Sequence, residues 1–428
     1  MKYIIVTLGC KVNQYETQAM ETLLNAHGHA RAGEGERADA VIINTCAVTA
    51  ESGRKSRQAV RAAREDNPGT VVAVCGCYSQ LSPDTAEKLG ADVVYGSGDR
   101  VKLVADVEAA AERGARARNV DAPFRRRLFE ELPAGNFSGR TRALLKIQDG
   151  CANFCTYCII PYTRGRPRSL PVADAARQAA ELDAQGYREL VVTGIEVASY
   201  GIDLPEKPGL ADVIAAISGS APNMRIRLGS LEPTVITEDF CRTLAGTGRV
   251  CRHFHLSLQS GSDGVLRGMN RKYDTAVFFE KTELLRRYFP GCGLTADLIV
   301  GFPGETEEEH RETLAFIEKC GFSHVHIFPY SRRPGTPADK MDGQLSRADK
   351  ARRAREAKAV SARTERAFME ESVGRVLPVL FETEEGGMWC GHSDTYLLTA
   401  APGENLRGLV KSVKINGIDG ENLVGEIV

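Results

Sequence analysis

Short β-branched runs alternate with longer amphipathic stretches along most of the chain. Four such runs lie in the first part of the sequence, at residues 3–8, 40–44, 70–74 and 92–95. Runs of this length separated by helical patterns are typical of parallel strands joined by crossover helices. Residues 1–118 are therefore predicted to form a small doubly wound α/β domain.

A second series of strands and helices follows a segment rich in proline, glycine and arginine, which predicts a basic linker at residues 119–141. Amphipathic stretches such as residues 172–185 and 307–319 separate its strands. Six parallel strands with crossover helices predict a partial or full β/α barrel over residues 142–340. The six runs are residues 144–147, 189–193, 225–228, 253–258, 294–300 and 324–328.

The pattern changes again in the last part of the chain. A predicted helix at residues 346–366 carries eight basic and three acidic residues, so residues 341–371 are predicted to form a basic helical connector. Short strands with glycine and asparagine turns follow, and they predict a small all-β barrel of the OB type over residues 372–428. These strands are residues 376–382, 388–390, 396–399, 408–415 and 423–427.

Composition places the chain among ordinary soluble globular proteins, because 43% of its residues are hydrophobic and 26% are charged. No apolar run approaches the roughly 18 to 20 residues that a membrane span needs, and the first residues lack a signal-peptide layout. We therefore expect a cytoplasmic protein with no membrane partner. The net charge of −1 gives no global argument for nucleic acid. Twelve cysteines in a reducing compartment favour metal binding over disulfides.

Three of these cysteines, Cys151, Cys155 and Cys158, directly follow the first predicted barrel strand. Barrel enzymes place their chemistry at this carboxyl end of the strands. Three thiolates within eight residues can hold a cubane iron–sulfur cluster and leave one iron open to another ligand. A zinc site is the rival interpretation, although structural zinc prefers CxxC pairs with a closed fourth position, and the nearest downstream histidine is His253. Buried cysteines without a ligand are the third alternative.

Three further cysteines, Cys10, Cys46 and Cys77, each follow a predicted strand of the first domain. The carboxyl ends of parallel strands lie along one edge, where ligands bind. Cysteines distant in sequence can therefore meet there, and a second cluster is predicted. Their spacing carries little information by itself, so unrelated buried cysteines remain an alternative, and Cys75 could take the place of Cys77.

The CxxxCxxC spacing with Tyr157 before the third cysteine resembles the radical S-adenosylmethionine enzymes. The resemblance implies a (β/α)6 partial TIM barrel, a 4Fe-4S cluster on Cys151, Cys155 and Cys158, and S-adenosylmethionine as a ligand. Glycines that let the backbone approach a ligand, and short polar side chains, also suit such a site. The GFPGE segment alone is equally typical of a turn before a helix. The residues implied to bind the cofactor are Tyr157, Gly194, Glu196, Ser230, Gln259, Ser260, Gly301 and Gly304.

The segments TLGCKVNQ, NTCAV and GCYSQ resemble the amino-terminal domain of the methylthiotransferases, and the likeness extends over the whole chain. It implies a second, auxiliary 4Fe-4S cluster on Cys10, Cys46 and Cys77 that takes part in sulfur supply. The branch it most resembles places a methylthio group on carbon 2 of threonylcarbamoyladenosine at position 37, in the anticodon loop of tRNA. S-adenosylmethionine would serve as methyl donor and radical source, with a protein electron donor such as flavodoxin or ferredoxin and a sulfur source as partners. Both clusters must approach one adenine, so the two cysteine sets are predicted to face each other.

The all-β tail resembles the RNA-binding TRAM domain, and OB-type barrels recognise nucleic acid through a strand face and loops. Clusters of arginine offer phosphate contacts despite the neutral total charge, although such clusters are often only solvated surfaces. The arginines predicted to bind RNA are Arg125, Arg126, Arg127, Arg166, Arg168, Arg352, Arg353 and Arg355.

Three other functions fit parts of this pattern. An enzyme that modifies isopentenyladenosine in tRNA shares nearly every motif. A methylthiotransferase acting on an aspartate of a ribosomal protein shares the clusters and leaves tRNA unchanged. A non-catalytic iron–sulfur sensor that binds RNA needs the tail but no turnover of S-adenosylmethionine.

Overall fold

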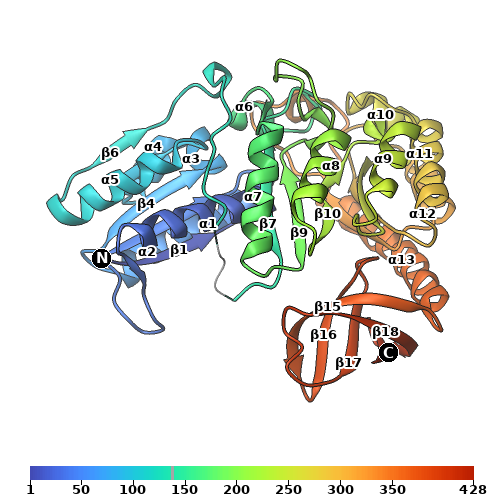
Figure 1. The fold of residues 1–428 in the computed structure, drawn as a ribbon. Coiled ribbons are helices and arrows are strands. Elements are labelled where there is room, and N and C mark those ends of the chain that lie inside the picture. Colours follow the sequence, from blue (N-terminus) through green and yellow to red (C-terminus); the bar gives the residue numbers. More distant parts are fainter. Residues whose placement is uncertain (136–138) are drawn as a thin grey trace.

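The computed structural model describes residues 1–135 and 139–428. The amino-terminal domain lies beside the barrel, at the left in Figure 1, and the OB-like tail lies below the barrel. Residues 136–138, which belong to the predicted basic linker, lie outside the described residues. The described part of this linker includes the 3-10 helix η1 (Pro123–Arg125) and lies against the first domain, where Tyr15 donates a hydrogen bond to the Leu132 carbonyl (3.0 Å).

The amino-terminal domain is a parallel six-stranded sheet with helices on both faces, which confirms the predicted doubly wound fold. Alternate strand residues pack on opposite faces, so β3 (Ala40–Thr45) buries Ile42 against α1 (Lys11–Ala26) and α5 (Arg100–Arg113), and Ile43 against α2 (Ala50–Asp66) and α4 (Pro83–Lys88). The sheet order is β2 (Ala30–Arg31), β1 (Lys2–Thr7), β3, β4 (Val71–Gly76), β5 (Val93–Tyr95) and β6 (Ala117–Asn119), and the short α3 (Cys77–Leu81) follows β4.

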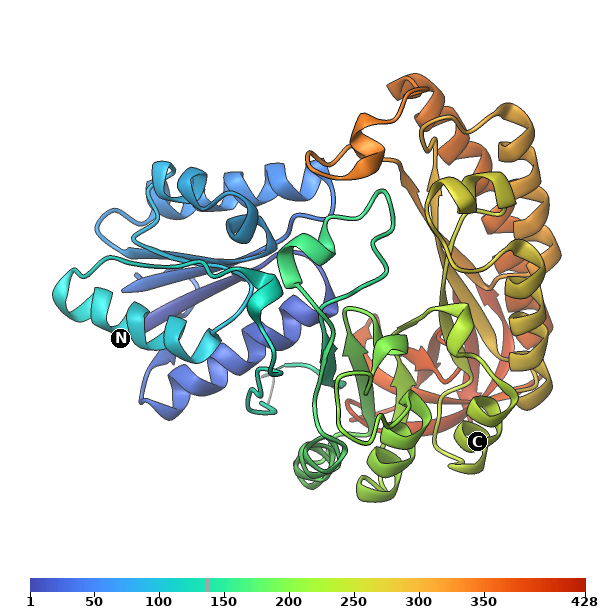
Figure 2. The ribbon, with the colours of Figure 1, turned by 90° about the horizontal axis from the view of Figure 1, so that it is seen from above.

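The central part is a partial β/α barrel with its helices on the outside (Figure 2). One half is β10 (Arg225–Leu228), β9 (Glu189–Gly194) and β7 (Ala143–Asp149), with the short antiparallel β8 (Arg168–Ser169) at its edge. The other half is β11 (Ser230–Leu231), β12 (His253–Gln259), β13 (Gly293–Val300) and β14 (His324–Pro329). Only Gly229 separates β10 from β11, so these two segments together occupy one strand position of the barrel. Counted in this way, the barrel has the six parallel strands that the sequence predicted.

The barrel helices bury one apolar face against the strands. They are α6 (Ile160–Arg164), α7 (Val172–Ala184), α8 (Leu210–Ser220), α9 (Glu238–Gly246), α10 (Asp263–Gly268), α11 (Thr275–Tyr288) and α12 (Glu307–Cys320), with 3-10 turns η2 (Val197–Ser199), η3 (Pro233–Val235) and η4 (Pro337–Lys340). The basic helix α13 (Arg347–Ser372) packs along β14 and α12 and contributes Ala357 and Val360 to the barrel core. α13 therefore packs against the barrel and shares its core, whereas the sequence analysis placed this helix in a separate connector that begins after residue 340.

The tail is a closed five-stranded barrel in the order β15 (Val376–Glu385), β16 (Met388–Ser393), β17 (Leu398–Pro402), β19 (Asn422–Ile427) and β18 (Val410–Asp419), which confirms the predicted OB-like fold. It docks near the starts of the central strands, where Arg225 donates hydrogen bonds to the carbonyls of Pro378 and His392 (both 2.8 Å). The tail therefore lies at the end of the barrel opposite to the carboxyl ends of the strands. Among the described residues, no helix is both long and apolar enough to cross a membrane.

Candidate active site

The loop that carries Cys151, Cys155 and Cys158 leaves β7 and is fixed at both ends by backbone hydrogen bonds. The Cys151 N–H donates to Gly165 (3.0 Å), and the Thr156 N–H donates to Met269 (3.1 Å). Gly150 has a φ of +77°, and a Cβ there would lie 2.0 Å from the Arg166 carbonyl oxygen, so only glycine fits. The loop therefore presents its thiols on a constrained backbone.

The three thiols of this loop form one group. Burial raises the pKa of Cys158 to about 12, and the nearby Cys155 thiol adds to the increase. Burial also raises the pKa of Cys151, with contributions from Cys158 and Cys155. Arg271 donates a hydrogen bond to the Cys155 sulfur (3.1 Å), so a cation already faces this donor set. Bound iron would stabilise the thiolates, because a metal ion deprotonates a coordinating thiol.

A three-cysteine loop suits a cubane cluster, in which each cysteine binds a different iron. Within residues 1–135 and 139–428, no three His, Cys, Asp or Glu side chains come close enough to bind a single metal ion. A cluster needs its thiols farther apart than one ion does. Three neighbouring thiols on one loop are the donor set that the predicted 4Fe-4S group requires.

The cysteines at the edge of the amino-terminal sheet also come together. Cys10 is exposed at this edge, yet desolvation by the protein around it raises the pKa of its thiol to about 11, and the thiols of Cys77 and Cys46 contribute to the increase. A Cβ on Gly9 would lie 2.9 Å from the Cys46 sulfur, so the Cys46 side chain packs over this glycine. Cys75 instead points into the core between the sheet and helices α1 and α5. The geometry thus groups Cys77, rather than Cys75, with Cys10 and Cys46.

The two cysteine sets face each other across the junction of the domains. The Cys77 thiol is among the groups that raise the pKa of Cys158. Hydrogen bonds close the junction on two sides, from Ser97 to the Thr163 carbonyl (2.6 Å) and from the Ala50 N–H to the Ser331 hydroxyl (3.0 Å). The edge of the first domain that carries Cys10, Cys46 and Cys77, here called the cysteine edge, therefore faces the cysteine loop of the barrel. One substrate could reach both cysteine sets in this arrangement.

A network of buried ion pairs also joins the domains at this point. Glu16 of α1 pairs with Arg100 (3.0 Å), Lys146 (3.5 Å) and Arg164, and all four side chains are fully buried. Burial alone would raise the pKa of Glu16, but the three cations outweigh it and lower this pKa to about 2. Arg164 also donates to the Asn13 side chain (2.9 Å), next to the cysteine edge.

Two buried carboxylates lie beside the cysteine loop. The Asn153 amide donates to Glu196 (3.2 Å) and to Glu232 (3.1 Å). Burial raises the pKa of Glu196 to about 7, and the neighbouring Glu232 adds to the increase. Paired acidic side chains at the carboxyl ends of β9 and β11 suit a ligand with an ammonium group, such as S-adenosylmethionine. Glu232 and Arg271 were not among the predicted site residues, although the acidic Glu232 directly follows a strand.

The other predicted cofactor residues divide into two groups. Gly194 ends β9, the Ser230 hydroxyl is exposed near that of Ser257 (3.4 Å), and Gln259 has a φ of +64° where the register of β12 shifts. Tyr157 packs against Val265, Met269 and Phe302, and Ser260 turns toward Thr313 of α12 (3.4 Å). The Gly301 N–H donates to Glu305, and the Gly304 N–H donates to Gly343 (2.9 Å). The polar atoms of Ser260, Gly301 and Gly304 are therefore used within the protein, and the Tyr157 ring packs in an apolar cluster.

Two arginines of the predicted RNA-binding set are buried, so their prediction was wrong. Arg168 donates to the carbonyls of Arg164 (3.0 Å) and Arg166 (2.8 Å), and Arg353 pairs with Glu305 (2.7 Å) and Glu307 (2.7 Å). Both are only 3% exposed, so neither can reach a phosphate. Arg126 and Arg352 are paired with carboxylates, whereas the exposed members of the set are Arg125, Arg127, Arg166 and Arg355.

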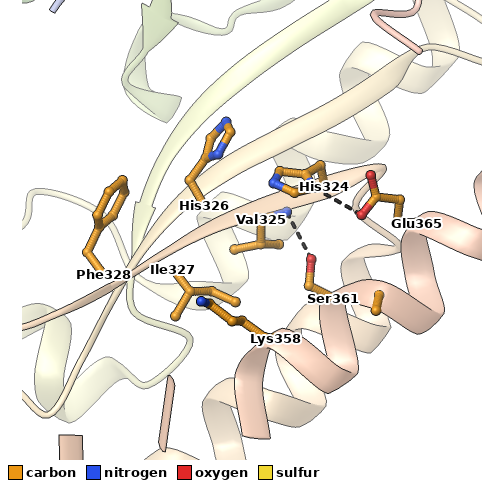
Figure 3. A pocket seen from close by; sticks show the side chains of 9 residues that line it. His324, Val325, His326, Ile327, Phe328, Lys358, Ser361 and Glu365 are labelled. Atoms are coloured by element: carbon orange, nitrogen blue, oxygen red, sulfur yellow. Dashed lines mark hydrogen bonds and ion pairs between the residues drawn. The ribbon is translucent and has the colours of Figure 1, made fainter. Parts of the chain in front are cut away.

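A separate pocket lies between β14 and α13, as Figure 3 shows. His324 pairs with Glu365 across it (3.0 Å), and the Ser361 hydroxyl accepts a hydrogen bond from the Val325 N–H (3.0 Å). None of the predicted cluster or cofactor residues lines this pocket. We therefore assign the candidate site to the domain junction.

Comparison with known proteins shows the family to which the chain belongs. The model of the Radical SAM superfamily matches residues 145–317, so the barrel and its cysteine loop define a radical S-adenosylmethionine enzyme, and a family described as "Uncharacterized protein family UPF0004" matches residues 2–96. Relatives named "Threonylcarbamoyladenosine tRNA methylthiotransferase MtaB" include one from Bacillus subtilis, 39% identical over 96% of this chain and 92% of its own, and one from Thermotoga maritima, 35% identical over 98% and 95%. The chain belongs to the methylthiotransferase family of radical S-adenosylmethionine enzymes.

Solved structures support the fold alone. The radical S-adenosylmethionine methyltransferase TsrM from Kitasatospora setae matches with a TM-score of 0.59 and 16% identity, over 79% of this chain and 75% of its own. The likeness therefore extends beyond the barrel, which occupies less of the chain than this.

Proposed function

We propose that this protein transfers a methylthio group to carbon 2 of threonylcarbamoyladenosine at position 37 of tRNA. The observation that carries the proposal is that the two cysteine sets face each other across the domain junction, where Cys77 packs in one apolar cluster with Ile160, two residues after Cys158. The substrate is that of the relatives from Bacillus subtilis and Thermotoga maritima, which are named as threonylcarbamoyladenosine tRNA methylthiotransferases. Carbon 2 of adenine carries no acidic proton, so a side-chain acid or base could not functionalise it readily.

In this proposal the chain holds and orients the reacting groups. Cys151, Cys155 and Cys158 hold one 4Fe-4S cluster, and Cys10, Cys46 and Cys77 hold the other. When bound, the clusters and S-adenosylmethionine would supply the electron, the radical, the sulfur and the methyl group that this chemistry needs. Glu196 and Glu232, oriented by Asn153, bind the ammonium group of the cofactor. The OB-like tail and exposed arginines contact the tRNA backbone.

The proposal requires partners that the chain does not contain. A protein electron donor such as flavodoxin or ferredoxin reduces the cluster of the barrel, and a sulfur source replenishes the auxiliary one. A cytoplasmic location is part of the proposal, because such partners and a tRNA substrate are found there.

Mass spectrometry of tRNA nucleosides tests this function. The tRNA comes from a strain that lacks this gene, and it is incubated anaerobically with reconstituted protein, reductant, sulfide and S-adenosylmethionine. We expect threonylcarbamoyladenosine to be converted to its 2-methylthio form. Accumulation of 5′-deoxyadenosine without any change in tRNA would reject the tRNA substrate and direct the search to proteins.

The same experiment examines a second candidate substrate. A relative from Bacteroides thetaiotaomicron named "tRNA-2-methylthio-N(6)-dimethylallyladenosine synthase" is 32% identical over 89% of this chain and 85% of its own. Conversion of isopentenyladenosine instead of threonylcarbamoyladenosine would assign the protein to that activity.

Replacing Cys77 with alanine is expected to remove the auxiliary cluster, because Cys77 lies with Cys10 and Cys46 at the cysteine edge. Iron content should fall by roughly half. Cys46→Ala should do the same, and both variants should still form 5′-deoxyadenosine but no methylthio product. The matched control is Cys75→Ala, which changes a core residue two positions away and should keep the wild-type iron content. Full iron content in Cys77→Ala, together with a loss in Cys75→Ala, would reverse this assignment.

A further inference from the structure

Three exposed aromatic rings gather beside the cysteine loop. Phe124 comes from η1, Phe154 from the cysteine loop between Cys151 and Cys155, and Tyr162 from α6. The two phenylalanine rings are stacked, with centroids 6.3 Å apart and planes 10° apart, and Tyr162 meets Phe154 edge-on at 5.9 Å. These rings, here called the aromatic triad, are 38%, 41% and 37% exposed respectively.

The backbone conformation that places Phe154 in the triad is strained. Phe154 has a φ of +46°, a left-handed conformation that bulky residues rarely adopt and that collects at ligand-binding sites. The Asn270 side chain donates to the Phe154 carbonyl (3.2 Å), which fixes this conformation. Gly165 lets η1 pack on α6, because a Cβ there would lie 2.1 Å from the Pro123 carbonyl oxygen. A strained loop that exposes an apolar ring is not explained by core packing.

The surroundings of the triad are cationic. Arg125 adjoins Phe124, Arg127 follows two residues later, and Arg166 lies just beyond α6. All three are exposed, and none has a carboxylate partner within the described part of the chain. By contrast, Arg126 is bound to Asp121 and Ser97 and helps to fix the segment. Aromatic faces next to unpaired cations match an unstacked base flanked by phosphates.

We infer that the aromatic triad is a stacking platform for an anticodon-loop base next to the target adenosine of the tRNA. The inference rests on the proposed function and adds the surface that positions the RNA. The exposed rings of Phe124 and Phe154 receive the base, and Arg125, Arg127 and Arg166 contact the adjoining phosphates. Phe154 lies between two cysteines of the loop. A base stacked on its ring therefore brings the adjoining target adenosine to the cysteine loop. Every base has an aromatic face that can stack, so the platform positions the RNA but does not select its sequence.

The test uses reconstituted protein and an anticodon stem-loop RNA that carries 2-aminopurine beside adenosine 37. Stacking should quench the 2-aminopurine fluorescence on binding to the wild type. Phe124→Ala should remove the quenching and weaken binding roughly tenfold, and Phe124→Tyr should restore both. The matched control is Leu128→Ala, because Leu128 is 85% exposed in the same segment but lies outside the triad. This control should bind as the wild type does.

Arg125→Gln and Arg127→Gln should each lower the slope of log Kd against log salt concentration by roughly one. Thermal midpoint and iron content of every variant report whether the fold and the clusters are intact. Wild-type affinity and quenching in an intact Phe124→Ala variant would overturn the inference. If the wild type methylthiolates tRNA and Phe124→Ala does so with unchanged KM for tRNA, the platform is rejected while the proposed function stands. If the wild type modifies no tRNA nucleoside, the proposed function fails, whatever the binding result.

Discussion

Replacement of Cys151 with alanine is expected to abolish formation of 5′-deoxyadenosine from S-adenosylmethionine. Cys151 is the first of three grouped thiols, and the hydrogen bond from its N–H to the Gly165 carbonyl (3.0 Å) fixes its backbone. With two thiols left, the cluster loses one of its three protein ligands. Chromatography of anaerobic reactions with dithionite should find 5′-deoxyadenosine at background level in this variant.

A buried cysteine of the same barrel provides the control for this prediction. Cys241 lies on α9 within the barrel core and away from both cysteine sets. Cys241→Ala should keep the iron content and the rate of cofactor cleavage. Cleavage at the wild-type rate in Cys151→Ala would show that the loop does not hold the radical cluster.

Replacement of Glu16 with alanine is expected to destabilise the protein by about 3–5 kcal/mol, the usual cost of leaving buried charges without their partner. Arg100 belongs to the first domain and Arg164 to the barrel, and Glu16 binds both. Asp149 partly compensates, because it lies 3.4 Å from both Lys146 and Arg164. Denaturant unfolding or scanning calorimetry should detect the change as a lower midpoint.

An exposed carboxylate of the same domain is the matched control. Glu36 is exposed, where it pairs with Lys2 and accepts a hydrogen bond from the Gly33 N–H (2.9 Å), so Glu36→Ala should change the midpoint little. Equal effects of the two substitutions would contradict the role assigned to the buried network.

The same network gives stability a defined pH dependence. The pKa of Glu16 falls from its ordinary value of 4.5 to about 2 on folding, because the cations outweigh the effect of burial. Its contribution is therefore complete above pH 4.5 and is lost as the pH falls toward 2. The difference in midpoint between wild type and Glu16→Ala should shrink over this interval.

Local features of the sequence were sufficient to predict the parts of the protein that depend on near neighbours. The spacing of Cys151, Cys155 and Cys158 within one loop determines that the thiols meet, because few backbone torsions separate them. The alternation of apolar runs and amphipathic stretches predicted both parallel sheets, since each strand must bury its two faces beneath helices. The closed barrel of the tail followed from short strands and turns in the same way.

Tertiary structure decided what depends on contacts between distant segments. The sequence favoured Cys77 but left Cys75 open, and the structure separates them because Cys75 points into the core while Cys77 lies with Cys10 and Cys46. Arg168 and Arg353 resemble the exposed arginines in a sequence, yet they are buried because carbonyls and carboxylates from other elements surround them. The aromatic triad joins segments that carry no common motif. Long-range packing fixes which side chains are buried and which meet, and local spacing does not encode it.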